Sequence, residues 1–262
     1  GSLKPVVLCL HGLTRNSRDF HDLARRLTDD YRVISADQRG RGRSESDPNA
    51  ANYRPDIYCE DMFTLLEHLK IKEITAIGTS MGGIMTMMME TLRPGLLRAA
   101  IINDIGPEIN PAGLERIKSY VGGGGPFKSW NAAAKALKAQ GPDVFPDYTD
   151  EDWIAFAQRT CTETSDGDIE FSYDTAIAKP FKHNDTAPDQ TDLWPVFDAL
   201  SRVPVLSIRG ALSDILSSGT VEKMRRLHPD FISVEIPYIG HAPMLNEPET
   251  LQAIQSFLKA KL

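Results

Sequence analysis

The chain has 262 residues, enough for one large domain whose hydrophobic core needs no disulfide or metal to stabilise it. Hydrophobic residues make up 41% of the sequence, charged residues 25% and aromatic residues 8%, a balance that excludes disordered, collagen-like and membrane-embedded chains. Asp and Glu outnumber Lys and Arg by 36 to 29, so the formal net charge is −7, whereas a protein that binds nucleic acid is expected to be basic.

The three cysteines, Cys9, Cys59 and Cys161, are odd in number and widely spaced, so they predict neither a disulfide framework nor a cysteine-based zinc site. His and Asp residues also lack the spacing of a metal site. The chain has no apolar run of 18 residues and no secretory signal. We therefore expect a reducing, cytoplasmic location, with no metal, no membrane span and no nucleic-acid partner. The sequence carries no signal for the oligomeric state.

Short apolar runs rich in β-branched residues alternate with longer amphipathic segments, a pattern typical of βαβ units and of a mainly parallel sheet flanked by helices. The expected strands are 6–10, 32–36, 74–78, 98–103, 203–208 and 232–236. The expected helices are 17–27, 56–69, 81–92, 192–200, 220–227 and 248–258. Ser17 and Thr220 are expected to cap their helices, and Pro248 suits a first helical turn.

About 100 residues separate the fourth expected strand from the fifth, far more than a single crossover helix uses. We therefore expect an α/β core formed by residues 1–106 and 191–262, and a mostly helical cap inserted at residues 107–190. The glycine run 122–125 can be a hinge of this cap or a simple connection between helices. The aromatic residues of the insertion can pack its own core or cover a pocket as a lid. They are Phe127, Trp130, Phe145, Trp153, Phe156 and Phe171.

The strongest local motif is the Gly-Thr-Ser-Met-Gly of residues 78–82, which follows an expected strand and precedes an apolar helix. In that context G-x-S-x-G is typical of a nucleophile elbow, a strained turn that exposes the serine hydroxyl. A serine hydroxyl is a poor nucleophile until a base takes its proton, and the base needs an acid to orient it. The motif therefore predicts Ser80 as the nucleophile, with a histidine and an acid elsewhere.

Of the six histidines, His241 follows the last expected strand, at the C-terminal end of the sheet, where sites in open α/β folds gather. We predict that His241 is the base. His11 also follows a strand, but its position before Gly12 is more typical of a residue that shapes a loop. The other histidines are expected at solvated positions, namely His21, His68, His183 and His228.

Two aspartates compete for the role of the acid. Asp214 follows the expected strand 203–208 by a short loop, and the order Ser80, Asp214, His241 matches triads built on a nucleophile elbow. Asp104 directly follows the fourth expected strand, where a carboxylate can instead cap the loop that enters the insertion. We therefore predict Asp214 as the acid and keep Asp104 as the alternative.

The anion of a tetrahedral intermediate needs two hydrogen-bond donors aimed at it. The Met81 amide directly follows the nucleophile at a helix N-terminus, where the helix dipole also favours an anion. The second donor is expected from the loop after the first strand, where Gly12 lets the backbone come close. We predict the Leu13 amide for this donor, with the Thr14 amide as the alternative.

Together these motifs resemble the α/β-hydrolase superfamily, in particular its capped serine esterases and related hydrolases. The matching segments are 11–12, 37–44, 78–83, 210–214 and 240–241. The resemblance implies the α/β-hydrolase fold, a Ser-Asp-His site and turnover without a cofactor. It also implies a structural role for loop 37–44, whose Arg39, Arg41 and Arg43 could otherwise look like an anion clamp.

Members of this superfamily usually have a β-hairpin before the first strand of this pattern. Here only residues 1–5 precede that strand, and Gly1-Ser2 is typical of a cloning remnant. We therefore expect the hairpin to be absent, through a truncated N-terminus or a reduced sheet edge.

The predicted reaction is acyl transfer to water through Ser80, and the aromatic insertion favours small to medium apolar carboxylic esters as substrates. One alternative is hydrolysis of a C–C bond in a ring-cleavage product, because such enzymes share a similar elbow. They resemble one another in a glycine-rich loop, which residues 13–16 (Leu-Thr-Arg-Asn) do not match. A ligand-binding protein without turnover is a third hypothesis. Dehalogenase and epoxide-hydrolase chemistry is disfavoured, because those relatives use an aspartate where Ser80 stands.

Overall fold

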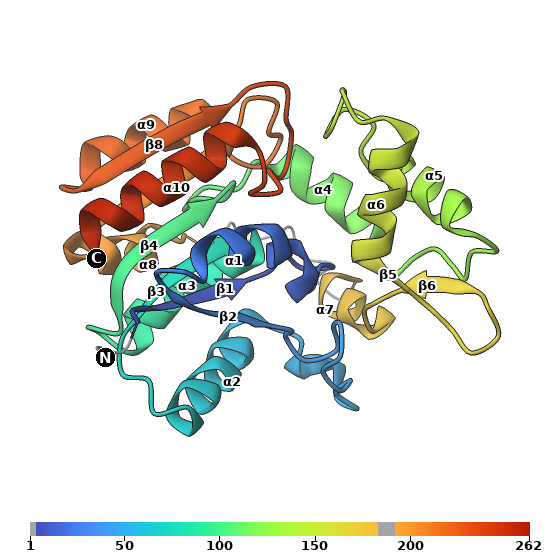
Figure 1. Ribbon diagram of the computed structural model, residues 1–262, viewed down its shortest axis with the longest axis horizontal. Coiled ribbons are helices and arrows are strands. Elements are labelled where there is room, and N and C mark those ends of the chain that lie inside the picture. Colours follow the sequence, from blue (N-terminus) through green and yellow to red (C-terminus); the bar gives the residue numbers. More distant parts are fainter. Residues whose placement is uncertain (1–3, 183–191) are drawn as a thin grey trace.

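Six parallel strands form one sheet in the computed structural model, which describes residues 4–182 and 192–262 (Figure 1). The strand order is β2-β1-β3-β4-β7-β8, so the strand that precedes Ser80 lies between β1 and β4. The strands are β1 (Val6–Leu10), β2 (Arg32–Ala36), β3 (Ile74–Thr79), β4 (Leu97–Asn103), β7 (Val205–Gly210) and β8 (Phe231–Ile236). The predicted parallel sheet is confirmed, and the bounds of β1 and β2 are those expected from the sequence.

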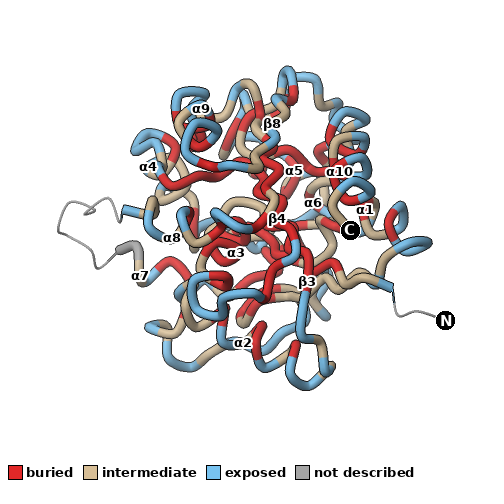
Figure 2. The backbone as a smooth tube through the Cα atoms, turned by 90° about the vertical axis from the view of Figure 1, so that its left-hand side faces the viewer, coloured by how far each residue is buried: buried red, intermediate tan, exposed pale blue. Residues whose placement is uncertain are grey.

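Helices cover both faces of this sheet, because consecutive side chains of a strand point to opposite faces. Val7 and Cys9 of β1 belong to the apolar cluster that includes α1 and α10. Leu8 and Leu10 belong to the cluster that includes α2, α3, α8 and α9. The buried β3 and β4 run through the centre of the molecule in Figure 2. These helices are α1 (His21–Leu27), α2 (Pro55–His68), α3 (Met81–Leu92), α8 (Trp194–Asp198), α9 (Ser218–Leu227) and α10 (Pro248–Lys261).

Two predicted helix starts are shifted by local capping. The expected helix 17–27 is a 3₁₀ turn (Ser17–Phe20) followed by α1, and its N-cap is Asn16, whose side chain accepts a hydrogen bond from the Arg18 amide. Helix α9 begins earlier than expected, because the Ser217 side chain accepts from the Thr220 amide. Ser17 and Thr220 are therefore not the caps. In both helices the cap is a short polar side chain two or three residues upstream of the amide that it satisfies.

The chain between β4 and α8 forms a separate group of elements beside the sheet, on the right of Figure 1. Helices α5 and α6 pack against each other there, and a short antiparallel strand pair accompanies them. Phe145, Tyr148, Trp153 and Phe156 stack or meet edge to face, so part of the aromatic content packs the insertion itself. The elements are α4 (Pro111–Tyr120), α5 (Trp130–Gln140), α6 (Asp150–Thr160), β5 (Cys161–Glu163), β6 (Ile169–Phe171) and α7 (Lys179–Lys182).

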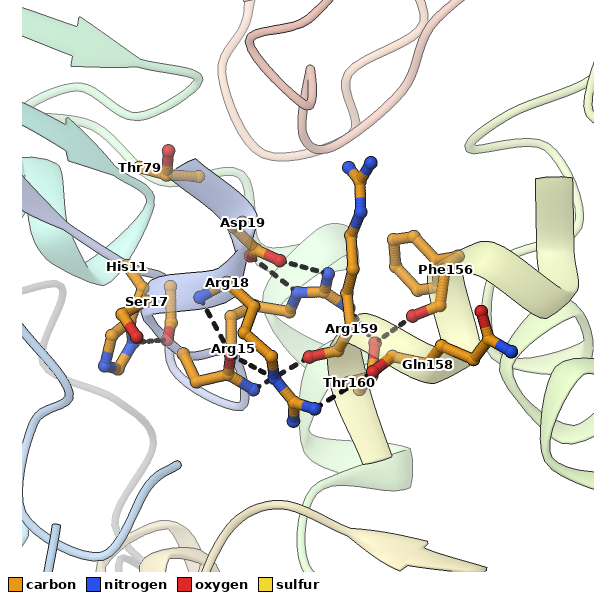
Figure 3. Close-up of polar contacts among 12 residues, drawn as sticks. His11, Arg15, Ser17, Arg18, Asp19, Thr79, Phe156, Gln158, Arg159 and Thr160 are labelled. Atoms are coloured by element: carbon orange, nitrogen blue, oxygen red, sulfur yellow. Dashed lines mark hydrogen bonds and ion pairs between the residues drawn. The ribbon is translucent and has the colours of Figure 1, made fainter. Parts of the chain in front are cut away.

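Side chains of the loop after β1 hold the C-terminal end of α6 (Figure 3). The last carbonyls of a helix have no partner inside the helix. Here the Asn16 amide donates to the Arg159 carbonyl at 2.9 Å, and the Arg18 guanidinium donates to the Gln158 carbonyl at 3.0 Å. The insertion is therefore fixed to the loop in which we expect an oxyanion-hole donor.

No helix within residues 4–182 and 192–262 is long and apolar enough to cross a membrane.

Glycines allow α3 to lie against the sheet at the turn that carries Ser80. A Cβ added to Gly78 would lie 2.2 Å from the Gly82 carbonyl oxygen, and one added to Gly82 would lie 2.0 Å from the Leu10 carbonyl oxygen. Each of these opposing atoms belongs to the backbone, so a larger residue would force the helix away from the strands.

We predict that Gly82→Ala destabilises the fold by roughly 2 kcal/mol or more, since the added methyl group displaces α3 from β1. The matched control is Gly219→Ala in the first turn of α9, where the nearest atom to an added Cβ is the Ser217 Oγ at 3.7 Å. That exposed change should be neutral or stabilise by up to about 1 kcal/mol. Urea unfolding monitored by circular dichroism measures both, and equal effects of the two substitutions would contradict the packing argument.

Candidate active site

Ser80 lies in the sharp turn between β3 and α3. Its backbone has a φ of +51° and a ψ of −115°, a left-handed conformation that costs of order 1–3 kcal/mol for a residue with a side chain. The turn is held on both sides: the Ser80 amide donates to the Asn103 carbonyl at 2.9 Å, and the Ser80 carbonyl accepts from the amides of Gly83 and Ile84. The predicted elbow is thus present, with Ser80 on the wall of a cavity.

His241 connects Ser80 to a buried carboxylate, and that carboxylate belongs to Asp104. The His241 Nε2 lies 2.9 Å from the Ser80 Oγ, and its Nδ1 lies 2.8 Å from the Asp104 Oδ2. The Asp104 side chain is fully buried, and its second oxygen accepts from the Gly210 amide at 2.9 Å. A carboxylate can only accept, so the His241 Nδ1–H donates a hydrogen bond to it and the lone pair of Nε2 faces the serine hydroxyl.

Asp214 does not contact His241, and its prediction as the acid is wrong for this geometry. Its carboxylate instead accepts two hydrogen bonds from Arg116 of α4, at 2.6 Å from Nε and 2.8 Å from Nη2. The reason lies in the strand order. Asp104 follows β4, the direct neighbour of β3, whereas Asp214 lies in the loop after β7, one strand further from Ser80.

The environment of Asp214 suits a permanent ion pair. Burial alone would raise the pKa of its carboxyl group, but the hydrogen bonds and charge of Arg116 hold that pKa below its usual range. Asp214 is therefore ionised throughout the neutral pH range and forms an ion pair with Arg116 of the insertion.

Asn103, which the sequence analysis did not identify, joins three segments of the site. Its carbonyl holds the Ser80 amide, and its side-chain amide donates to the Thr79 Oγ1 at 3.1 Å and to the Pro243 carbonyl at 2.8 Å. The elbow and the loop of His241 are thereby tied to the same strand end. A signal was present in the sequence, because a polar Asn-Asp pair ends an otherwise apolar strand next to the elbow strand.

Met81 directly follows Ser80, and Leu13 and Thr14, the two candidates for the second oxyanion donor, both line the cavity of Ser80. Met81 is the first residue of α3, so its amide has no acceptor within the helix. Leu13 lines the cavity together with Ser80, and a Cβ added to Gly12 would lie 3.7 Å from the Ser80 Cβ. The loop is thus as close to Ser80 as expected, although an alanine would also fit at Gly12.

Arg41 holds the loop after β1 in place through hydrogen bonds. Its guanidinium is buried and donates to the Leu13 carbonyl at 3.0 Å, the Arg39 carbonyl at 2.9 Å and the Tyr58 hydroxyl at 2.8 Å. Arg39 binds Asp61 through two nitrogens. Both arginines therefore have the structural role that the resemblance implies, and neither lines the cavity of Ser80.

His11 shapes the same loop, as predicted. Its Nδ1 donates to the Gly12 carbonyl at 2.7 Å, and its Nε2 accepts from the Gln38 amide at 3.0 Å, an arrangement that only the neutral ring can make. Burial lowers the pKa of His11 to about 4. Of the histidines expected at solvated positions, His228 is buried against the Leu200 carbonyl, whereas His183 lies outside the described residues.

A cavity of about 130 Å³ opens at Ser80 between the sheet edge and the insertion. The core contributes Leu13, Ser80 and His241, and the insertion contributes mainly apolar side chains and Arg116. Trp153 and Phe156 pack against each other within the insertion and also line the cavity. Within the described part of the chain, no cluster of three His, Cys, Asp or Glu residues could hold a metal ion.

Comparison with known proteins gives the same assignment of fold. Residues 5–248 match the family model described as the alpha/beta hydrolase fold. The chain is 36% identical to the 3-hydroxybutyrate-oligomer hydrolase of Cupriavidus necator, over 96% of this chain and 87% of that protein. It is 28% identical to the 2-(acetamidomethylene)succinate hydrolase of Mesorhizobium japonicum, over 98% of this chain and 88% of that protein. An alpha/beta hydrolase structure from Novosphingobium aromaticivorans superimposes with a TM-score of 0.92 at 46% identity, covering 98% of this chain and 90% of that one.

The neutral His11 predicts an acid-sensitive fold. The unfolded chain binds a proton at His11 below about pH 6.5, whereas the folded chain does so only near pH 4, so stability falls as the pH drops through this window. The loss from this residue is on the order of 3 kcal/mol. Urea unfolding at pH 7.5 and pH 4.5 should show a decrease that is about 2–3 kcal/mol smaller in His11→Gln than in the wild type. Equal decreases would contradict the assignment.

Proposed function

The chain belongs to the family with the alpha/beta hydrolase fold, and from that premise we propose that it is a serine hydrolase that cleaves carboxylic esters of small molecules. The observation that carries the proposal is the continuous hydrogen-bonded series from the Ser80 Oγ through His241 to the Asp104 carboxylate. Family membership supports hydrolysis, and this series supports a serine nucleophile.

In the proposed reaction His241 takes the proton of Ser80 while the Ser80 Oγ forms a bond to the ester carbonyl carbon. The oxyanion accepts hydrogen bonds from the Met81 and Leu13 amides, each worth on the order of 3 kcal/mol of the barrier. The imidazolium gives its proton to the departing alcohol as the C–O bond breaks. Water, activated in turn by His241, then attacks the acyl-enzyme and releases the acid with Ser80 restored.

Asp104 keeps His241 in this cycle without reacting itself. Its Oδ2 stabilises the imidazolium that forms during each step, and the Gly210 amide on Oδ1 keeps the carboxylate from rotating away. We assign Ser80, His241 and Asp104 to the catalytic triad, with Asp104 in place of the expected Asp214.

The cavity supports a small or medium substrate with an apolar body, and we propose that residues 107–190 act as its cap. Phe145, Trp153 and Phe156 line it from the insertion. The 36% identical relative is named for an oligomer of a hydroxy acid, whose units are joined by ester bonds. The relative named for 2-(acetamidomethylene)succinate keeps the alternative of a bond other than an ester, so the test below separates reactivity of the serine from ester turnover.

The nucleophile is tested by intact-mass spectrometry after incubation with a fluorophosphonate, which requires no knowledge of the substrate. We expect one adduct on the wild type and none on Ser80→Ala. An unlabelled wild type that is folded by circular dichroism would contradict an activated Ser80 and favour a ligand-binding protein. Labelling of Ser80 combined with no turnover of short acyl and aryl esters would instead remove ester hydrolysis and favour C–C bond hydrolysis.

The acid is tested by comparing two aspartates with the same substitution. Asp104→Asn should lower kcat for a neutral ester by about 10³- to 10⁴-fold, because the amide no longer stabilises the imidazolium. Asp214→Asn should lower it by at most about tenfold, since Asp214 holds Arg116 and not His241. Steady-state kinetics with p-nitrophenyl acetate measures both, and the reverse ranking would restore Asp214 as the acid.

A further inference from the structure

Two arginines, Arg15 and Arg116, are among the described residues that line the cavity. Each of the three nitrogens of the Arg15 guanidinium donates a hydrogen bond to another side chain of the protein. Its Nε and Nη2 donate to the two oxygens of Asp19, and its Nη1 donates to the Thr160 Oγ1 (Figure 3). Its Cζ lies 4.1 Å from the centre of the Phe156 ring. Arg15 thus joins the loop after β1 to the end of α6.

Arg116 binds its aspartate, Asp214, through one edge of its guanidinium. Nε and Nη2 face Asp214, and the guanidinium is also within hydrogen-bonding range of the Tyr120 hydroxyl, whereas no carboxylate or carbonyl oxygen of the described residues accepts from Nη1. This nitrogen lies on the cavity wall, since a Cβ added to Gly141 would be 3.6 Å from it. Arg116 therefore offers the cavity a fixed cation beside the Tyr120 hydroxyl, and Asp214 holds that cation in place.

Tyr120 adds a hydroxyl on the same side of α4. It lies four residues after Arg116, so the two side chains project from one face of the helix, and both line the cavity. Burial raises the pKa of Tyr120, which keeps its hydroxyl protonated and able to donate at neutral pH. The rest of the wall contributed by the insertion is largely apolar. In such a cavity the few polar groups decide how a ligand is oriented.

Guanidinium N–H groups beside a hydroxyl are suited to a carboxylate, because charge-assisted hydrogen bonds of this kind are the strongest that a neutral-pH site provides. We propose that the preferred substrates are esters that carry a carboxylate, which the Arg116 Nη1 and the Tyr120 hydroxyl bind while Ser80 attacks the ester carbonyl. Asp214 binds the opposite edge of the guanidinium and fixes its direction. This inference rests on the proposed ester hydrolysis and names the substrate class.

The alternative is that the Arg116–Asp214 pair only fastens α4 to the loop after β7. The two roles differ in what they predict for specificity. If the pair is only structural, its loss changes the turnover of every ester alike, because it alters the shape of the cavity. A carboxylate-binding residue affects only the ester that carries the charge, and it acts mainly through KM.

The test uses 3-acetoxybutanoate and its methyl ester, which differ only in the carboxylate, and measures released acetate. The wild type should hydrolyse the acid with the higher kcat/KM. Arg116→Gln should lower kcat/KM for the acid by roughly 10- to 100-fold, mainly by raising KM, and change that for the methyl ester by less than about threefold. Tyr120→Phe should lower the value for the acid by a smaller factor, and Arg116→Lys should restore part of it.

The matched control is Lys118→Gln, which removes one positive charge from the same helix. Lys118 pairs with Glu115 and does not line the cavity, so the preference for the acid should stay as in the wild type. Turnover of the methyl ester by each variant shows that it is folded.

Three outcomes would overturn the inference. A wild type without preference for the acid, or an equal loss on both esters in Arg116→Gln, would leave the pair as a fastening while ester hydrolysis stands. A wild type that releases acetate from neither ester, although a fluorophosphonate labels Ser80, would remove ester hydrolysis and this inference with it.

Discussion

The close approach of α3 to the strands is the constraint on which the site depends. Because Gly78 and Gly82 have no side chain, the start of the helix can lie against β1 and β3, and the chain must turn sharply at Ser80 to reach it. The turn places the Ser80 hydroxyl above the sheet edge and leaves the Met81 amide at the helix N-terminus unpaired within the helix. The strain at Ser80 persists because its amide and carbonyl are both hydrogen-bonded.

The two residues at the end of β4 connect the turn at Ser80 to the rest of the site. Asn103 holds the Ser80 amide and the loop of His241, and the next residue, Asp104, binds His241 and the Gly210 amide. Three segments, at the ends of β3, β7 and β8, are thereby fixed to one strand end. Such an arrangement explains how groups far apart in the sequence reach hydrogen-bonding distance, because each loop is short and begins at a rigid, buried strand.

The sequence was sufficient to predict the sheet, both layers of helices and the position of Ser80 in a sharp turn, because hydrophobic periodicity and the elbow motif are local signals. It was not sufficient to predict which aspartate contacts His241. Asp104 and Asp214 both follow strands at the same edge, and only the order of strands shows that β4 lies beside β3. Strand order is a long-range property that no local pattern encodes. One oxygen of Asp104 accepts from the Gly210 amide at the end of β7 and the other contacts His241, so neither of these contacts caps the loop that enters the insertion.

The two arginine–aspartate pairs whose arginine lines the cavity differ in the same way. Arg15 and Asp19 lie in the loop after β1 and hold α6 through Thr160, so each of the three nitrogens of that guanidinium donates to another side chain. Arg116 belongs to the insertion and reaches back to Asp214 of the core with one edge only. Arg116 is thus oriented by a carboxylate of the core and also lines the cavity of Ser80. The insertion contributes apolar side chains and one cation to that cavity, and the proposed preference for substrates with a carboxylate rests on this combination.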